Sequence, residues 1–289
     1  MLIYSAETCT ETSQTAKELL LGTDVGAYTT MRTVTRQGIF RLGQHVDRLY
    51  SSILAITQPE YISKHKVCIS DMTTLQKRLK VEYSKQSLRS QIIIATRCIL
   101  KHVEGDARIY VRVNPFVAKD HILIFGERLP MLSECGRGII ADGLRNTPST
   151  KDLSWAHERQ TLERLLGPGV DEVLLTHDGL VSEGLSSNFF VIRKGVVYTA
   201  PVGAVLAGTM RETILKILKT ESIPLREETP RLSEYTNWDE CFISSTSRGI
   251  LPFSALEYQG QEHCYDIDLS GKLGKLLLEQ LLRDSESIY

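Results

Sequence analysis

The stretch Val181-Ser-Glu-Gly-Leu-Ser-Ser-Asn-Phe-Phe-Val191 decides how the rest of this chain is interpreted. It places Glu183 beside a glycine, and a short turn of serine and asparagine then leads into apolar residues typical of a buried strand. Because glycine lets another molecule approach the backbone closely, Glu183 is a candidate for contact with a ligand. Lys151 lies upstream in a polar loop, and the pairing of an amine with a distant carboxylate is the first indication of function.

The composition is that of a globular protein. The 289 residues are 42% hydrophobic and 24% charged, enough for one large or two ordinary domains with their own cores. The formal net charge is −1 and the basic residues are scattered, so we expect no nucleic-acid partner. No apolar run reaches the length of a transmembrane helix and the first residues do not resemble a secretory signal, so we expect no membrane partner.

The cysteines and histidines predict neither disulfides nor a metal site. The six cysteines are widely spread without a Cys-x-x-Cys pair, which indicates reduced thiols and a cytoplasmic location. A nucleophilic cysteine is the less favoured alternative, because no local motif places a histidine beside one. The seven histidines are isolated in the sequence, so we expect no metal ligands among them.

The N-terminal half predicts a hairpin followed by a helix. Residues 27–34 are rich in β-branched and aromatic side chains, and a turn over 36–38 leads to a second strand over 39–42. Apolar residues at helical spacing indicate a helix over 45–56, which ends before Pro59. Beyond it we expect a helix over 70–79 and strands over 91–95, 108–113 and 121–125.

The C-terminal half predicts an antiparallel meander between helices. A strand over 138–141 and a polar loop over 145–151 precede a helix over 155–166, which ends at Gly167-Pro-Gly169. Asp178-Gly179 and Lys194-Gly195 are hairpin turns between β-rich runs. We expect strands over 172–175, 180–182, 188–193, 196–199 and 240–244, and helices from about 208 and over 269–282.

These elements predict an α+β chain of two domains. A small N-terminal domain covers residues 1–128, residues 129–136 connect the domains, and a larger C-terminal domain covers 137–289.

Lys151 and Glu183 together suit one kind of cofactor. A lysine that forms a Schiff base must be partly desolvated to be nucleophilic near neutral pH. A carboxylate held against a pyridine nitrogen keeps that nitrogen protonated, and the protonated ring is an electron sink. The residues alone are also explained by a solvated loop lysine and an exposed hairpin glutamate. The functional interpretation is a pyridoxal phosphate site.

The chain resembles the class IV, or fold-type IV, pyridoxal-phosphate aminotransferases. This family includes branched-chain and D-amino-acid aminotransferases and aminodeoxychorismate lyase. The similarity extends over about residues 24 to 253 and rests on blocks in matching order. Besides Lys151 and 181–190, these blocks are Gly26-Ala-Tyr-Thr-Thr-Met-Arg32, Phe40-Arg-Leu-Gly-Gln-His-Val-Asp-Arg-Leu49, Gly195-Val-Val-Tyr-Thr-Ala-Pro201 and Leu206-Ala-Gly-Thr-Met-Arg-Glu212.

The resemblance implies a fold and a set of site residues. The fold is a small α/β N-terminal domain and a larger, mostly antiparallel β pseudo-barrel domain with helices. Lys151 is the catalytic residue, and Glu183 holds the ring nitrogen of pyridoxal 5′-phosphate. The other expected cofactor-binding residues are Arg48, Ser187, Asn188, Gly208, Thr209, Met210, Ser245 and Thr246. The expected substrate residues are Tyr28, Thr29, Arg112 and Ser247.

The residue types are consistent with these phosphate assignments. A guanidinium such as that of Arg48 binds phosphate in a bidentate way. Gly208-Thr-Met-Arg211 opens a helix, whose free N–H groups favour an anion. Ser244-Ser-Thr-Ser247 follows a buried strand and offers hydroxyls. A solvated helix arginine and ordinary helix or turn capping are the plainer alternatives.

Several positions depart from the aminotransferase pattern. Met210 stands where aminotransferases usually carry threonine, and Thr29 stands where many carry glutamate. Ala156 stands where a branched-chain enzyme often has tyrosine. The strand from Arg108 lacks the family's glycine-rich continuation. Met210 and Thr29 resemble the lyase branch.

The leading prediction is an aminotransferase that moves an amino group between an amino acid and a 2-keto acid. The resemblance also implies a homodimer. Two alternatives stay open: an aminodeoxychorismate lyase that releases pyruvate, and a non-catalytic relative that serves as a binding module. The sequence leaves open the amino donor, the acceptor and the choice between L- and D-amino acids.

Overall fold

The computed structural model describes residues 1–5, 8–69, 71–131 and 133–289, which form two compact units. The first unit comprises Met1–Pro130, Thr150–Glu158 and Leu282–Tyr289, and the second comprises Met131–Ser149 and Arg159–Leu281. Relative to the predicted domains 1–128 and 137–289, two segments change sides. The segment that carries Lys151 and the C-terminal segment both belong to the first unit.

The first unit contains a seven-stranded sheet in which every neighbouring pair is antiparallel. β3 (Ala27–Val34) lies near its middle and pairs along its length with β5 (Ala107–Val113), so that Tyr28 is opposite Arg112. The remaining strands are β16 (Ser285–Ser287), β4 (Gly38–Phe40), β6 (Ile122–Arg128), β1 (Leu2–Ser5) and β2 (Thr8–Glu11), in the sheet order β16-β4-β3-β5-β6-β1-β2.

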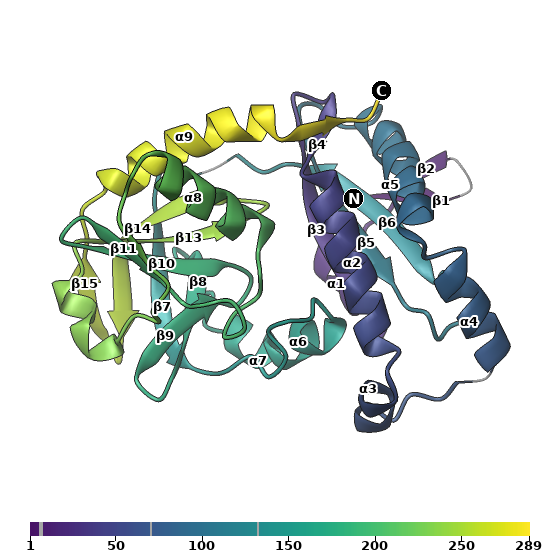
Figure 1. Cartoon of the computed structure of the whole chain (residues 1–289), viewed down its shortest axis with the longest axis horizontal. Helices are drawn as coiled ribbons and strands as arrows, with labels where there is room; N and C mark the ends of the chain where they lie inside the picture. Colours follow the sequence, from purple (N-terminus) through teal and green to yellow (C-terminus); the bar gives the residue numbers. More distant parts are fainter. Residues whose placement is uncertain (6–7, 70, 132) are drawn as a thin grey trace. The chain divides into compact units, whose positions relative to one another are not determined.

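Helices cover both faces of this sheet. α2 (Leu42–Ile56) and α5 (Lys85–Leu100) pack on one face, where apolar side chains of the strands and helices form the main core. Figure 1 shows α2 lying along β3. On the other face, Tyr28, Tyr110 and Phe125 pack against Leu19 and Leu153. The smaller helices of the unit are α1 (Ala16–Leu21), α3 (Pro59–Lys64), α4 (Met72–Lys80) and α6 (Leu153–Glu158).

The predicted strand over residues 91–95 is wrong, because these residues lie inside α5. The run of isoleucines there suggested a strand. In the helix, the buried residues Leu88, Ile92, Ala95 and Ile99 recur at spacings of three and four, while Ile94 is 47% exposed. The strand at 27–34 and the helix at 45–56 are confirmed, the helix beginning earlier. The predicted helix over 70–79 corresponds to α4, and its first residue, Ser70, lies outside the described residues.

The second unit is built around a closed barrel of six strands. Their order is β10-β13-β14-β7-β8-β9, and β9 pairs again with β10. Only β7 runs parallel to its two barrel neighbours, so the barrel is mostly antiparallel, as the predicted α+β fold required. The barrel strands are β7 (Gly136–Asp142), β8 (Glu172–His177), β9 (Leu180–Gly184), β10 (Asn188–Arg193), β13 (Glu240–Ser245) and β14 (Gly249–Tyr258).

Further elements extend or cover this barrel. β11 (Val196–Thr199) and β12 (Leu225–Arg226) continue the sheet beyond β10, and β15 (Gln261–Cys264) pairs with β14. The helices are α7 (Gln160–Glu163), α8 (Thr209–Thr220), the 3-10 turn η1 (Leu232–Asn237) and α9 (Leu269–Arg283), of which the residues to Leu281 belong to this unit. The single helix predicted over 155–166 is two short helices, α6 and α7.

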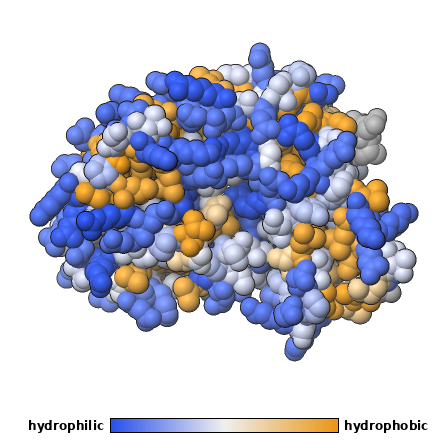
Figure 2. Space-filling model, viewed as in Figure 1, coloured by the Kyte–Doolittle hydropathy of each residue, from blue (hydrophilic) through white to orange (hydrophobic). Residues whose placement is uncertain are grey.

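Polar residues cover most of the face in Figure 2, and apolar atoms reach the surface there in separate patches. Among the described residues, none of the helices combines the length and the apolar character that crossing a bilayer requires.

Candidate active site

The residues predicted to form the site fall into two groups, one in each unit. Lys151, Arg48, Tyr28, Thr29 and Arg112 belong to the first unit. The second unit carries Glu183, Ser187, Asn188, Gly208, Thr209, Met210, Ser245, Thr246 and Ser247. Each group is described within its own unit.

The segment that carries Lys151 is hydrogen-bonded to the start of β3. The backbone N–H of Tyr28 donates to the carbonyl of Lys151 over 3.0 Å, and the N–H of Leu153 donates to the carbonyl of Gly26 over 2.9 Å. The N–H of Lys151 donates to the hydroxyl of Ser52 on α2 over 3.1 Å. The backbone of Lys151 is therefore fixed from both sides, although sequence alone placed it in a loop.

Gly26 allows this close approach. Its φ of +156° is a conformation that side chains rarely adopt, and a Cβ there would lie 2.8 Å from the carbonyl oxygen of Val113. The amine of Lys151 lies 4.6 Å from the centroid of the Tyr28 ring, within the range of a cation–π contact. Tyr28 is only 3% exposed, so the ring is a fixed surface for the amine.

Arg48 is held by two uncharged side chains. Its Nη2 donates to the hydroxyl of Thr29 over 3.2 Å and lies 3.2 Å from Nδ1 of His45. The Thr29 hydroxyl lies 2.9 Å from the same Nδ1 and donates to it, since it accepts from Arg48. His45 therefore carries its proton on Nε2 in this network.

His45 is a site residue that the sequence prediction missed. It is fully buried, and burial, together with the charges of Arg48, Lys151 and Arg41, lowers its pKa well below the usual value. A neutral imidazole accepts a hydrogen bond at Nδ1, which a protonated one cannot do. The available signal was its spacing of three residues from Arg48, which puts both on one side of a helix.

Thr29 and Tyr28 lie on opposite faces of the sheet, as neighbours in a strand must. Thr29 is buried beneath α2 with His45, so its assignment to substrate stays a prediction while its contacts are those of a support for Arg48. Arg112 is the cross-strand partner of Tyr28 and donates to the carbonyl of Leu19. Burial lowers the pKa of Arg112, and the charge of Asp120 opposes that shift.

In the second unit, Glu183 lies at the end of β9 and is 3% exposed. Its register partner is Asn188, and this pair closes the barrel. The N–H of Leu206 lies 3.4 Å from a carboxylate oxygen of Glu183, and the side-chain amide of Asn188 donates to the carbonyl of Leu206 over 2.8 Å. Both side chains thus hold the backbone that leads into α8.

Gly208 is the N-cap of α8, and no side chain caps this helix. A Cβ on Gly208 would lie 2.2 Å from Oδ1 of Asn188, so the chain needs a glycine here for steric reasons. The free N–H groups of the first turn and the helix dipole favour an anion at this end. The hydroxyl of Thr209 lies 3.4 Å from that of Thr246, which brings the two predicted phosphate segments together.

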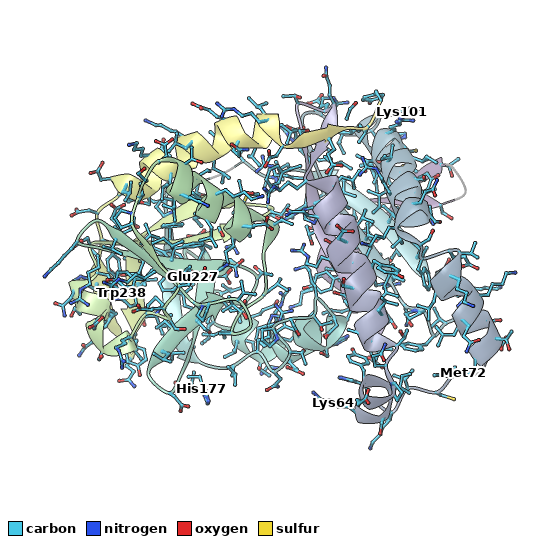
Figure 3. All side chains as sticks on the ribbon, viewed as in Figure 1. Lys64, Met72, Lys101, His177, Glu227 and Trp238 are labelled. Atoms are coloured by element: carbon cyan, nitrogen blue, oxygen red, sulfur yellow. The ribbon has the colours of Figure 1, made fainter. Side chains whose placement is uncertain are left out.

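Met210 and Arg211 anchor the first turn of α8 in the unit. The side chain of Met210 is 1% exposed, so the group it can offer to an anion is its backbone N–H. Arg211 donates to the carbonyl of Ala200 over 2.8 Å and to Glu227 over 2.7 Å, and Figure 3 labels Glu227. These contacts fix the direction in which the helix start points.

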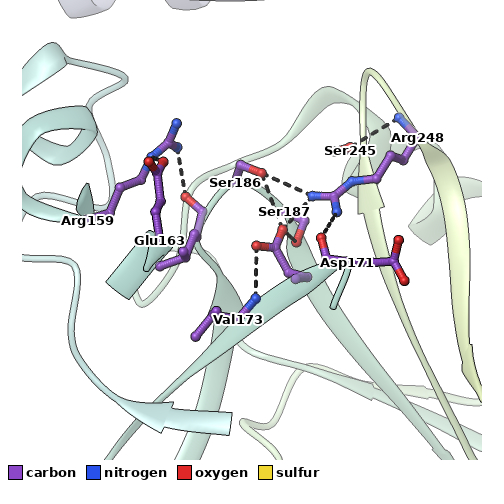
Figure 4. Close-up of polar contacts among 10 residues, drawn as sticks. Arg159, Glu163, Asp171, Val173, Ser186, Ser187, Ser245 and Arg248 are labelled. Carbon is purple, nitrogen blue, oxygen red and sulfur yellow. Dashed lines mark hydrogen bonds and ion pairs between the residues drawn. The ribbon is translucent and has the colours of Figure 1, made fainter. Parts of the chain in front are cut away.

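A buried carboxylate, Glu172, organises the turn before Asn188 (Figure 4). It accepts from Ser187 over 2.8 Å, from Ser186 over 3.3 Å and from Arg248 over 2.5 Å. Arg248 also reaches Ser186, and its N–H donates to the hydroxyl of Ser245 over 3.2 Å. The sequence prediction missed Glu172 and Arg248, since neither lies in a motif, and it took Ser187 as a direct cofactor contact.

A second arginine steadies the same turn. Arg159 donates to the carbonyl of Leu185 over 2.9 Å and pairs with Glu163 over 3.0 Å (Figure 4). Ser247 lies between β13 and β14, in the turn that also carries Ser245 and Thr246. The second unit therefore presents hydroxyls and backbone N–H groups from two turns and a helix start.

The donor sets fit a phosphorylated pyridine. The first unit supplies an amine on a buried aromatic ring and a guanidinium. The second supplies a buried carboxylate and the uncapped start of a helix of twelve residues. A phosphate, a pyridinium nitrogen and an aldehyde are the groups that these partners recognise.

The family model for amino-transferase class IV matches residues 26–256, from the start of β3 into β14. The chain belongs to the class IV aminotransferases. The predicted family, the fold class, the transaminase activity and the pyridoxal 5′-phosphate cofactor of this aminotransferase are confirmed at the level of the family.

Known proteins resemble this aminotransferase over most of its length. The D-alanine aminotransferase of Listeria innocua serovar 6a is 22% identical over 265 residues, 80% of this chain and 78% of that protein. The branched-chain aminotransferase of Thermoproteus uzoniensis, solved with norvaline, has a TM-score of 0.73 at 20% identity and covers 100% of this chain and 99% of its own. The branched-chain amino acid aminotransferase of T.th., complexed with N-(5′-phosphopyridoxyl)-L-glutamate, has a TM-score of 0.71 at 17% identity and covers 100% and 98%.

Proposed function

We propose that this aminotransferase moves an amino group between a small amino acid and a 2-keto acid, with Lys151 as its catalytic residue. The observation that carries the proposal is the fixed position of Lys151. Its backbone is hydrogen-bonded to β3 and α2, and its amine lies 4.6 Å from the ring centroid of Tyr28. A solvated loop lysine has no need of that support.

The roles of the residues follow from their surroundings. When bound, pyridoxal 5′-phosphate draws electrons from Cα of the amino acid and takes over its amino group. The amine of Lys151 holds the cofactor and moves the proton between Cα and C4′. The buried carboxylate of Glu183 keeps the ring nitrogen protonated, because a proton there neutralises a charge that burial disfavours.

The phosphate is assigned to three groups. Arg48 binds it with its guanidinium, steadied by Thr29 and His45. The N–H groups after Gly208 and the hydroxyls of Thr209, Ser245 and Thr246 complete the binding.

The substrate assignments rest on Tyr28 and Arg112, which are cross-strand partners on one face of the sheet. A guanidinium suits the carboxylate that amino acids and 2-keto acids share. Norvaline and the glutamate adduct in the two solved relatives are consistent with that class of substrate. The homodimer and the cytoplasmic location stay predictions, which size-exclusion chromatography with light scattering and cell fractionation test.

A half-reaction screen tests the proposal. Purified protein loaded with pyridoxal 5′-phosphate is mixed with single L- or D-amino acids, and the expected result is loss of the cofactor's visible absorbance and recovery of pyridoxamine 5′-phosphate. Borohydride reduction followed by peptide mapping should find the cofactor on Lys151. Cofactor attached to another lysine, or no conversion by any amino acid, contradicts the proposal.

The same material separates the two alternative functions. Pyruvate released from aminodeoxychorismate without a keto-acid acceptor identifies a lyase, which the departures at Met210 and Thr29 had suggested. A Lys151→Ala variant that leaves the cellular function unchanged identifies a binding module.

A further inference from the structure

A cluster of metal-ligand side chains lies in the first unit, and none of its residues belongs to the candidate active site. Cys9, Cys98 and His102 bring their ligand atoms within 4.8 Å of one another. Cys9 lies on β2 at the edge of the seven-stranded sheet, Cys98 lies in the last turn of α5, and His102 follows the helix end.

The backbone directs these three side chains to one place. Cys9 is half-buried and packs against the main core, while the other residues of β2 are exposed. β2 contacts α5 and lies beside it in Figure 1. Cys98 and His102 are four residues apart and therefore project from the same side of the helix. The N–H of His102 donates to the carbonyl of Ile99 over 3.0 Å, which continues the helical turn.

Two thiols and one imidazole are the ligands that zinc takes in tetrahedral sites. With usual zinc–ligand distances, the two sulfurs would lie about 3.8 Å apart and each about 3.6 Å from the nitrogen. The observed 4.8 Å limit requires only a small closure of the three side chains. The imidazole is exposed and can rotate to supply it.

We propose that Cys9, Cys98 and His102 bind one zinc ion whose fourth position is open to water or to a small ligand. Two thiolates balance the charge of the ion, so the filled site adds no net charge to the unit. The carbonyl end of α5 also favours a cation. Lys101, labelled at this end of α5 in Figure 3, opposes the cation but favours the thiolates, so its two effects offset each other.

This proposal revises the expectation that the chain has no metal site. No sequence motif links the three ligands, because Cys9 and Cys98 come together only through the packing of an edge strand against a helix. A Cys-x-x-x-His spacing at 98 and 102 was visible, but two ligands do not define a site.

Zinc binding by the full-length protein tests the proposal. The protein is stripped with a chelator under reducing conditions, reloaded with zinc, and titrated against a chromophoric chelator, with the metal content measured by mass spectrometry. We expect one zinc per chain, and cobalt substitution should give the thiolate-to-cobalt absorption of a Cys2His site. Cys98→Ser and His102→Asn should each weaken binding by at least about tenfold.

Matched controls are the exposed cysteines elsewhere, in Cys135→Ser and Cys264→Ser, which should bind zinc as the parent does. His102 is exposed, so its variant should fold normally. The proposal is overturned if the parent retains no zinc, if His102→Asn binds as tightly as the parent, or if peptide mapping of protein purified without oxidant finds Cys9 and Cys98 joined as a disulfide. The test does not depend on transaminase activity.

Discussion

A carboxylate oxygen of Glu172 lies 2.5 Å from Nη2 of Arg248, and this ion pair ties the start of β8 to the turn after β13. Glu172 is 2% exposed, and the same carboxylate accepts from Ser187 and Ser186. One buried acid therefore sets the positions of two turns that supply proposed cofactor-binding residues. A fixed network of this kind positions ligand-binding groups that do not touch each other.

Glu172→Gln should lower the melting temperature by several degrees. It leaves the guanidinium of Arg248 beside a neutral amide, and breaking a buried ion pair from one side costs about 3 kcal/mol. The control is Glu234→Gln, which breaks the pair with Arg193 at a site where both side chains are more than a third exposed. That variant should change stability by less than about 1 kcal/mol. Differential scanning calorimetry compares them, and equal shifts would contradict a structural role for Glu172.

Lys151→Ala should lower the transamination rate on the order of 10³-fold or more, because it removes both the cofactor link and the proton carrier. The protein should still bind pyridoxal 5′-phosphate, although borohydride would no longer trap it. Lys216→Ala is the matched control, since that lysine pairs with Glu212 on the surface. Steady-state rates with a keto acid and the best amino donor provide the measurement. A variant as active as Lys216→Ala would rule out the assignment.

Burial of His45 should make the stability of the first unit depend on pH. Its pKa is lowered well below 6.5 in the folded chain, mainly by burial, whereas in the unfolded chain it is near 6.5. The unfolded state therefore takes up the proton first as the pH falls. The stability contribution is complete above about pH 6.5 and decreases below it, by on the order of 1 kcal/mol at pH 5.5.

His45→Gln should remove this dependence, so its melting temperature should fall less than that of the parent between pH 7.5 and 5.5. His177→Gln changes an exposed histidine and should keep the parental slope. The comparison uses slopes because the variant also loses contacts with Arg48 and Thr29. Identical slopes for parent and His45→Gln would show that His45 is not responsible.

Gly208→Ala should destabilise the protein and weaken cofactor retention. The added Cβ would lie 2.2 Å from Oδ1 of Asn188, and forcing a methyl group into packed structure costs about 1–3 kcal/mol. Gly274→Ala is the control, because nothing lies within 4 Å of its Cβ position in α9. That change should be neutral or stabilising by up to about 1 kcal/mol. Melting temperature and retained cofactor after dialysis are measured; retention equal to that of Gly274→Ala would argue against the steric account.

The hairpins of the barrel unit could be predicted because their signals are local. Asp178-Gly179 and Lys194-Gly195 both have positive φ at both positions, as a tight hairpin turn requires, and these residue types tolerate it. By contrast, β14 was missed because it contains Pro252, which lacks the N–H of a ladder residue and argues against an interior strand.

The site was predicted where a residue type implies its own chemistry, and was missed where only packing gives the residue a role. Lys151 and Glu183 were chosen as an amine and a carboxylate with a cofactor in common. His45 and Glu172 act through other side chains, and their roles depend on long-range contacts. The return of the Lys151 segment to β3 was equally invisible, because its hydrogen bonds join residues far apart in sequence.

A single register pair, Glu183 with Asn188, closes the barrel, and it is also the pair that we assign to the cofactor. Closure of the seam and cofactor binding are therefore thermodynamically linked. A cofactor that binds only the closed seam makes opening more costly by RT ln(1 + [L]/Kd). By reciprocity, any change that loosens the seam weakens the cofactor's hold by the same free energy. Hydrogen exchange at the Asn188 amide reports this coupling directly, even for variants with no measurable turnover.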